Sequence, residues 1–250
     1  NLKQIGISNH VAKGEKMYSS RFMGNKAYLV TYKTVDPLFV IDLSNETKPT
    51  VLGELHIPGY STYLHPYDEN HLIGIGMETE EIVNKNSIGK VTSTTSKITG
   101  MKMALFDVSD VNNPTQLSQT IIGDSRTTSA ILTNPKALLF SKEKQLLAIP
   151  VNNYSEDFEI DSSIDSYSSI VDSYTNYNKS YVSEGYFVYK ININDGFNLK
   201  GVITHETSQK SKNKSSYSYN YNNSKLLRGL YIDNNLYTIS ETAIKVNNLD

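Results

Sequence analysis

The stretch PLFVIDLSNETKP, residues 37 to 49, decides the fold because the chain contains three versions of it. A near-copy, MALFDVSDVNNP, covers residues 103 to 114, and a more divergent copy, FVYKININDGFN, covers residues 187 to 198. Each copy begins with an apolar run typical of a β-strand and continues into Asp, Asn, Ser or Gly residues that favour a tight turn. The repeat therefore predicts a strand and a turn that recur along the chain.

A longer cycle of four strand-like segments, which we call a, b, c and d, surrounds each copy. In the first cycle these segments are KMYSSRFM, AYLVTYK, LFVIDL and TVLGELHI. Four-stranded units that recur every 40 residues or more are typical of a β-propeller, whose blades bury their faces against neighbouring blades. The sequence thus predicts an all-β fold, a β-propeller of about four antiparallel blades that forms a single domain over residues 1–250.

The blade boundaries follow from the positions of these segments. We expect blades at residues 17–57, 60–122 and 129–205 and a partial blade at residues 227–249; the third blade is expected to begin with the strands SAILT and ALLFS. Residues 2–8, LKQIGIS, are expected to form a d strand that pairs with residues 243–249 and closes the ring. The alternative is that residues 2–8 complete a blade of a longer parent protein.

Composition excludes several classes of function. The 250 residues carry a formal net charge of -2 and a pI of about 6.2, which gives no concentrated basic surface for nucleic acid. No apolar run is long enough to span a membrane, and the first ten residues lack the apolar core of a signal peptide. Cys is absent, so disulfides and thiolate metal sites are excluded, and no cofactor is expected.

Three long inserts are expected on one face of the propeller. In an up-and-down blade the b-to-c and d-to-a connections emerge on the same side, because the strand direction reverses at each step. Residues 78–100 and 152–184 lie between b and c segments, and residues 206–224 lie between d and a segments. Inserts this long in a compact domain are commonly functional or disordered.

Tyrosines in two of these inserts are the candidate binding residues. Residues 152–184 and 206–224 are rich in Tyr, Ser and Asn, a composition typical of recognition loops as well as of inert low-complexity insertions. A protein or glycan ligand is the expected partner. The candidates are Tyr154, Tyr167, Tyr174, Tyr177, Tyr181, Tyr217, Tyr219 and Tyr221.

Metal and catalytic motifs are weak or missing. The segment HPYDENH supplies His65, Asp68 and His71 as weak candidates for metal ligands, although Pro and Asp in a short hairpin also favour a turn. The segment GIGMET lacks the third Gly of a dinucleotide fingerprint, and we expect Gly74 and Gly76 to allow close strand packing instead.

Residues 20 to 76, from SRFMGNKAYLVTYK to HLIGIG, closely resemble a family of archaeal and bacterial secreted proteins with a C-terminal β-propeller domain distantly related to WD repeats. The resemblance continues through ALFDVSDVNNPTQLSQTIIG, ALLFSKEKQLLAIPV and LYIDNNLYTISETAIKVNNLD. It implies an extracytoplasmic location, secreted or at the cell surface, and a longer parent protein of which this chain is the C-terminal half. The family has no assigned activity, so the resemblance implies no catalytic residue.

Three functional hypotheses follow. The first is a non-catalytic binding or scaffold module that engages a protein or glycan through the face with the long inserts. The second is a propeller enzyme, for example a metal-dependent hydrolase with a site in the axial channel. The third is a structural half of a larger propeller with no activity of its own.

Overall fold

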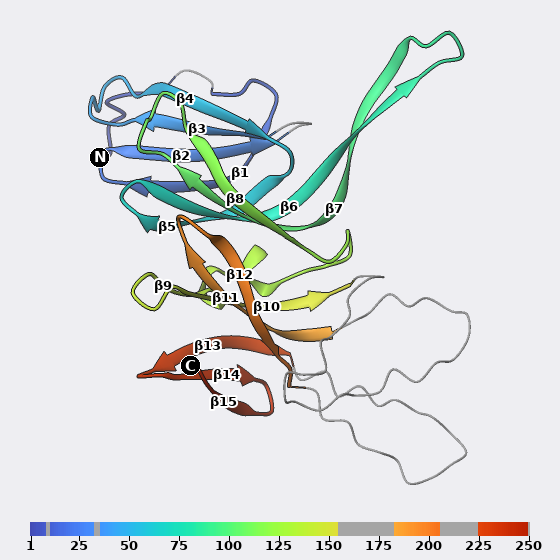
Figure 1. The fold of residues 1–250 in the computed structure, drawn as a ribbon. Helices are drawn as coiled ribbons and strands as arrows, with labels where there is room; N and C mark the ends of the chain where they lie inside the picture. The colour runs from blue at the N-terminus through green and yellow to red at the C-terminus, as the bar shows by residue number, and fades with distance from the viewer. Residues whose placement is uncertain (9–10, 33–35, 155–182, 206–224, 250) are drawn as a thin grey trace. The chain divides into compact units, whose positions relative to one another are not determined.

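The computed structural model describes residues 1–8, 11–32, 36–154, 183–205 and 225–249. These residues form strands and two short 3₁₀ helices, with no α-helix among them, which confirms the predicted all-β class (Figure 1). The chain divides into two compact units. The first comprises residues 1–126 and 192–197, and the second comprises residues 127–191 and 198–250.

The first unit contains two four-stranded antiparallel sheets in which every strand lies beside the next strand in sequence, β1-β2-β3-β4 and β5-β6-β7-β8. This order is the up-and-down arrangement expected of propeller blades. The strands are β1 (Lys16–Met23), β2 (Lys26–Tyr32), β3 (Asp36–Asp42), β4 (Thr50–Ile57), β5 (Tyr60–Asp68), β6 (His71–Lys85), β7 (Val91–Asp107) and β8 (Thr115–Ile122).

The second unit contains a four-stranded sheet, β9-β10-β11-β12, and a three-stranded sheet, β13-β14-β15. Both sheets keep the order of the sequence and the antiparallel pairing of the first unit. The strands are β9 (Leu139–Ser141), β10 (Leu146–Asn153), β11 (Ser183–Asn192), β12 (Gly196–Ile203), β13 (Leu226–Ile232), β14 (Asn235–Ser240) and β15 (Ile244–Asn248).

The three copies of the repeated segment share one structural feature. Each forms a hydrogen-bonded turn after the third strand of a four-stranded sheet. The side chains of Asp42, Asp107 and Asn192 each accept a hydrogen bond from the backbone N–H two residues ahead, at 2.9, 2.8 and 2.9 Å. Hydrogen bonds from Ser44 and Ser109 also lower the pKa of the Asp42 and Asp107 carboxyl groups. These Asx turns explain why the sequence repeats an acid or amide at this position.

Each unit has an apolar cluster between its two sheets. In the first unit the alternate residues of β2, β3, β6 and β7 that face each other include Tyr28, Val40, Leu72 and Phe106, all essentially excluded from solvent. In the second unit Tyr186 and Leu236 belong to the corresponding cluster. Burial of these faces, at roughly 25 cal/mol per Å² of apolar surface, is the main force that holds neighbouring sheets together.

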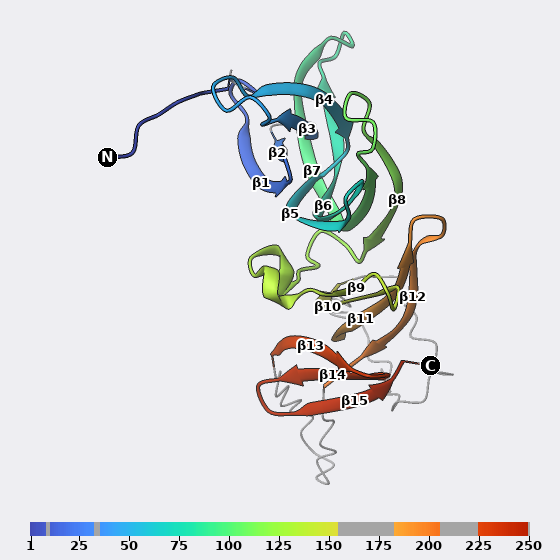
Figure 2. The ribbon, with the colours of Figure 1, turned by 90° about the vertical axis from the view of Figure 1, so that its left-hand side faces the viewer.

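The structure differs from two strand predictions. Residues 2–8 have no strand assignment (Figure 2). The expected closure of the ring with residues 243–249 stays a prediction. A Cβ atom at Gly6 would lie 2.2 Å from the carbonyl oxygen of Glu46, so this segment passes close to the turn between β3 and β4. The segment SAILT is a 3₁₀ helix, Ala130–Leu132, because the side chain of Ser129 caps it by accepting a hydrogen bond from the Ile131 N–H.

The insert at residues 78–100 is regular structure. Strands β6 and β7 continue beyond their sheet as a two-stranded ribbon that projects from the first unit (Figure 1). Of the other two inserts, residues 155–182 and 206–224 lie outside the described residues.

Candidate functional site

Three tyrosines gather at one end of the two sheets in the first unit. The ring centroids of Tyr18 and Tyr60 are 4.6 Å apart, those of Tyr32 and Tyr60 are 4.8 Å apart, and Tyr18 meets Tyr32 edge to face at 5.8 Å. All three side chains are half-buried. We call these residues the tyrosine cluster; its rings contact one another and still present surface to solvent.

Strand direction explains why these residues meet. Tyr18 lies near the start of β1 and Tyr60 is the first residue of β5, while Tyr32 ends β2 and pairs with Lys16 of β1. In an antiparallel meander, the starts of the a strands and the ends of the b strands lie at the same end of the sheet. The ribbon of β6 and β7 extends from this same end, because Tyr60 pairs with Met77 just before the ribbon begins.

Polar groups surround the tyrosine cluster. The ammonium group of Lys16 lies 5.4 Å from the centroid of the Tyr18 ring, within the range of a cation–π interaction. The hydroxyl groups of Tyr32 and Ser96 are hydrogen-bonded, which fixes the tyrosine cluster beside the base of the ribbon.

A buried ion pair lies at the same end of the sheets. Lys102 is 1% exposed, and its Nζ atom lies 3.4 Å from Oε2 of Glu78, which is 8% exposed. Lys102 also donates a hydrogen bond to the carbonyl oxygen of Pro58. The carboxylate therefore neutralises a charge that would otherwise be costly to bury.

Hydrogen bonds next to this ion pair fix the turn that leads into Tyr60. The Gly59 N–H donates a hydrogen bond of 2.9 Å to the hydroxyl of Thr79, and the Thr79 N–H donates one of 3.0 Å to Glu78. Since Pro58 and Gly59 immediately precede Tyr60, these bonds determine where the Tyr60 ring enters the tyrosine cluster.

Close packing of β5 on β6 completes the positioning of Tyr60. A Cβ atom on Gly76 would lie 1.8 Å from the carbonyl oxygen of Tyr60, and one on Gly74 would lie 2.4 Å from the Ser61 hydroxyl. Only glycine leaves room for the backbone at these positions. The prediction that Gly74 and Gly76 allow close strand packing is confirmed.

The hairpin with the candidate metal ligands forms pairs of side chains instead. His71 Nδ1 lies 2.7 Å from the Asp68 carboxylate, and His65 Nδ1 lies 2.9 Å from the Tyr63 hydroxyl. Burial, together with the positive charge of Arg21, lowers the pKa of His65 to about 4. Across the described part of the chain, no group of three His, Asp or Glu side chains is arranged to hold a metal ion.

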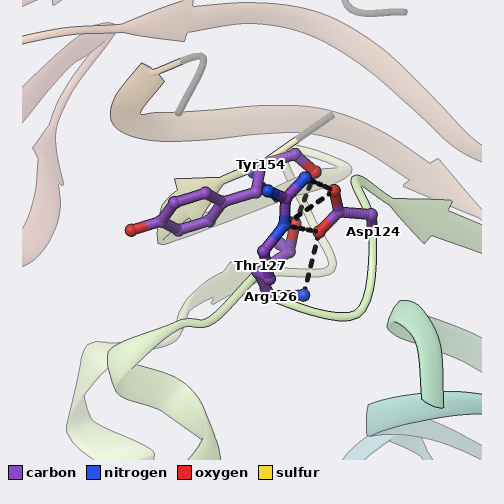
Figure 3. A network of polar contacts seen from close by, with 4 residues as sticks. All are labelled: Asp124, Arg126, Thr127 and Tyr154. Atoms are coloured by element: carbon purple, nitrogen blue, oxygen red, sulfur yellow. Dashed lines mark hydrogen bonds and ion pairs between the residues drawn. The ribbon is translucent and has the colours of Figure 1, made fainter. Parts of the chain in front are cut away.

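Of the eight tyrosines proposed from the inserts, the structure describes Tyr154. Its backbone N–H donates a hydrogen bond of 3.0 Å to the Thr127 hydroxyl, which in turn donates one of 3.1 Å to the Tyr154 carbonyl (Figure 3). These bonds fix the point where the chain leaves β10. The remaining candidates, outside the described residues, are Tyr167, Tyr174, Tyr177, Tyr181, Tyr217, Tyr219 and Tyr221.

A turn drawn in the same figure belongs to the first unit. The guanidinium of Arg126 donates hydrogen bonds of 3.1 Å to both carboxylate oxygens of Asp124 (Figure 3). These hydrogen bonds lower the pKa of the Asp124 carboxyl group. The pair stabilises the turn that follows β8.

Sequence reasoning missed the tyrosine cluster, although a signal for part of it exists. The a strands of the first two blades both carry Tyr followed by Ser, in Tyr18-Ser19 and Tyr60-Ser61. An aromatic residue at equivalent positions of two neighbouring blades predicts an aromatic contact between them. Tyr32 gives no such signal, because its place in the cluster depends on its pairing with Lys16.

The meander sheets and the repeated Asx turn define an all-β protein built from blade-like repeats. A sequence model described as the β-propeller domain matches residues 1–250, and the chain belongs to this family. No described helix has the length and apolar character needed to cross a membrane.

The similar proteins are archaeal. An uncharacterized protein of Methanocaldococcus jannaschii is 39% identical over 160 residues, which covers 64% of this chain and 22% of the relative. An uncharacterized protein of Archaeoglobus fulgidus is 32% identical over 149 residues, covering 60% of this chain and 21% of the relative. The matched region thus spans about a fifth of each of these relatives.

Proposed function

We propose that this chain is a non-catalytic binding module that works outside the cytoplasm and engages a partner protein through the tyrosine cluster. The observation that carries the proposal is the meeting of Tyr18, Tyr32 and Tyr60 at a solvent-facing end of two sheets. Tyrosine supplies a large, rigid and amphipathic contact surface at a small cost in conformational entropy, and it is enriched among the residues that dominate binding energy.

The surroundings of the tyrosine cluster support a protein partner. Lys16 supplies a positive charge at its edge, and the adjoining ribbon supplies backbone groups with hydroxyl side chains. This combination of aromatic anchors and a polar rim is the usual anatomy of a protein interface. The extracytoplasmic location is supported by the resemblance to the secreted family.

A selection experiment tests the binding role. A display library of random linear 12-residue peptides is selected against the immobilised chain, and the affinities of the enriched peptides are measured by fluorescence anisotropy. We expect Tyr18→Ala and Tyr60→Ala to weaken binding at least about 10-fold, as loss of a dominant aromatic contact does. Tyr18→Leu, which keeps apolar bulk, serves as a second variant if the alanine variants unfold.

Phe22→Ala is the matched control, because Phe22 is an exposed aromatic residue of the same strand outside the tyrosine cluster. It should leave peptide affinity unchanged. Failure to enrich any peptide, or equal binding by the Tyr18 and Tyr60 variants, would overturn the proposal. Binding of a glycan array that depends on these tyrosines, with no peptide enriched, would assign the surface to glycans instead.

The location has its own test. Antibodies against this domain are applied to intact cells that express the full-length parent, with and without external protease. Labelling that the protease removes is the expected result, whereas labelling only after lysis would contradict an extracytoplasmic role.

A further inference from the structure

The ribbon of β6 and β7 leaves two strand edges without a ladder partner. Strand β6 pairs with β5 as far as Met77, and β7 pairs with β8 only from Met101 onward. Between these points β6 and β7 pair with each other alone, through residues 78–85 and 91–100. In the described part of the chain, no strand covers the outer edge of either one. Such edges are ready templates for a further strand.

The two edges differ in how they are protected. On β6 the ribbon carries Glu80, Glu81 and Lys85, and charges of this kind discourage edge pairing. On β7 the segment Val91–Ser96, VTSTTS, has neither charge nor proline and is rich in β-branched residues. Its first five residues are exposed. The β7 edge therefore combines high β-propensity with no protection against pairing.

The unprotected edge begins at the hydrogen bond that joins the ribbon to Tyr32 of the tyrosine cluster. Ser96, the last residue of the segment, is hydrogen-bonded through its hydroxyl to Tyr32. A strand paired along residues 91–96 of β7 therefore ends near the Tyr32 hydroxyl, on the β8 side of the sheet, while Tyr60 lies on the β5 side. Backbone hydrogen bonds along the edge and side-chain contacts with Tyr32 would then belong to a single binding site, as in other complexes formed by strand addition.

Charge indicates the kind of strand that fits. Lys90 and Lys97 flank the uncharged segment, and β7 contains no acidic residue from Val91 to Phe106. Glu80 and Glu81 lie opposite Lys97 and Ser96 on β6, one strand further than β7 from the added strand. Lys16 adds a positive charge at the tyrosine cluster. An acidic segment complements these charges. A second copy of this chain does not, because antiparallel pairing of two β7 edges brings Lys97 of one copy near Lys90 of the other.

We propose that an extended acidic segment of a partner protein adds to β7 as a third strand along Val91–Ser96 and contacts Tyr32, the member of the tyrosine cluster that is bonded to the ribbon. The proposal rests on the proposed function and names the chemistry of its ligand. Main-chain hydrogen bonds would supply affinity, while the lysines and tyrosines select sequence.

The test uses the peptides enriched from the 12-residue library. We expect these peptides to have a net negative charge and alternating β-branched residues. Val83 and Thr94 are register partners at the same height of the ribbon but on opposite edges. Thr94→Glu should therefore weaken peptide binding about 10-fold or more by repulsion at the β7 edge, while Val83→Glu, at the β6 edge, should change it less than about 2-fold.

Hydrogen exchange gives a direct readout of strand addition. Amide protons of residues 91–96 that point away from β6 should become protected when a selected peptide binds, whereas the outer amides of residues 79–84 should not. Strand addition is overturned if the peptides lose affinity with Tyr18→Ala but not with Thr94→Glu and give no protection, and that outcome leaves the proposed function intact. If neither Tyr18→Ala nor Thr94→Glu weakens peptide binding, both strand addition and the proposed function are overturned.

Two further outcomes count against the proposal. Enrichment of neutral or basic peptides contradicts an acidic ligand. A dimer in light scattering that Thr94→Glu converts to monomer would show that the β7 edge serves a second copy instead.

Discussion

The hydroxyl of Ser19 donates a hydrogen bond of 2.7 Å to the backbone carbonyl of Ser61. The two serines occupy equivalent positions in successive blades, each directly after a tyrosine of the tyrosine cluster. The bond therefore links β1 to β5 at the point where the rings of Tyr18 and Tyr60 are in contact. A side-chain-to-backbone hydrogen bond between the first strands of the two sheets therefore accompanies the aromatic contact.

Removing Lys102 should destabilise the protein strongly. Lys102→Met leaves the Glu78 carboxylate buried without its partner, and loss of one member of a buried pair typically costs about 3–5 kcal/mol. The double variant Lys102→Met, Glu78→Met should recover most of this loss, because no charge remains buried. Urea unfolding of the wild type, both single variants and the double variant measures the coupling. A loss in the double variant equal to the sum of the losses in the two single variants would show that the two charges act independently.

Gly76→Ala should be among the most damaging small substitutions. The added Cβ atom meets the Tyr60 carbonyl at 1.8 Å, so β5 and β6 must separate, and we expect a loss of more than about 2 kcal/mol. Gly201→Ala is the matched control, because a Cβ there has no neighbour within 4 Å. Thermal unfolding of the two variants should differ clearly. Similar melting temperatures would contradict the close approach of the strands.

His65 should make stability fall as the pH falls below neutrality. Its folded pKa of about 4 lies below the ordinary value of 6.5, so the unfolded chain binds the proton first. Stability is complete above pH 6.5 and declines toward pH 4, by about 2 kcal/mol after allowance for solvent around the ring. Urea unfolding at pH 7 and pH 4.5 measures the difference, and His65→Asn should reduce it.

His205 requires a control in the same experiment. Burial, with a contribution from Lys245, also lowers the pKa of His205. His205 therefore also makes the protein less stable as the pH falls. His205→Asn should therefore leave the part of the pH dependence that belongs to His65. An unchanged pH dependence in His65→Asn would show that His65 is not held neutral by the fold.

Tyr186→Phe should stabilise the second unit. The Tyr186 side chain is fully buried, and among the described residues its hydroxyl has no hydrogen-bond partner. Removal of an unpaired buried hydroxyl should gain about 1 kcal/mol. Tyr32→Phe is the comparison, because it loses the hydrogen bond to Ser96 and should bring no gain. Calorimetric melting of both variants tests this, and a lower melting temperature for Tyr186→Phe would reveal a partner for its hydroxyl.

The strands and turns with a repeated chemistry could be predicted from the sequence. Asp42, Asp107 and Asn192 form the same turn by a local hydrogen bond, so the sequence pattern contains all the information needed. Gly76 was predictable for a similar reason, because glycine within an apolar strand indicates a close approach. Residues 129–133 were misassigned because a serine cap competes locally with strand pairing.

The binding surface depends on contacts that a linear pattern does not contain. The ribbon strand VTSTTS has few apolar residues, so the alternation that identifies a strand is missing, and its pairing with β6 comes from continuation of the sheet. The tyrosine cluster joins residues from three strands. The candidate tyrosines of residues 155–182 and 206–224 were chosen by composition and stay a prediction.

The ribbon of β6 and β7 keeps a constant register from Thr79 opposite Ile98 to Asn84 opposite Ser93. Insertions or deletions that add or remove whole opposed pairs would change its reach without disturbing the blade at its base. A change of one residue on one strand would instead turn every side chain beyond it to the other side. Natural variants of this arm should therefore differ in length by matched steps on both strands, so that its reach can evolve while the sheet beneath stays the same.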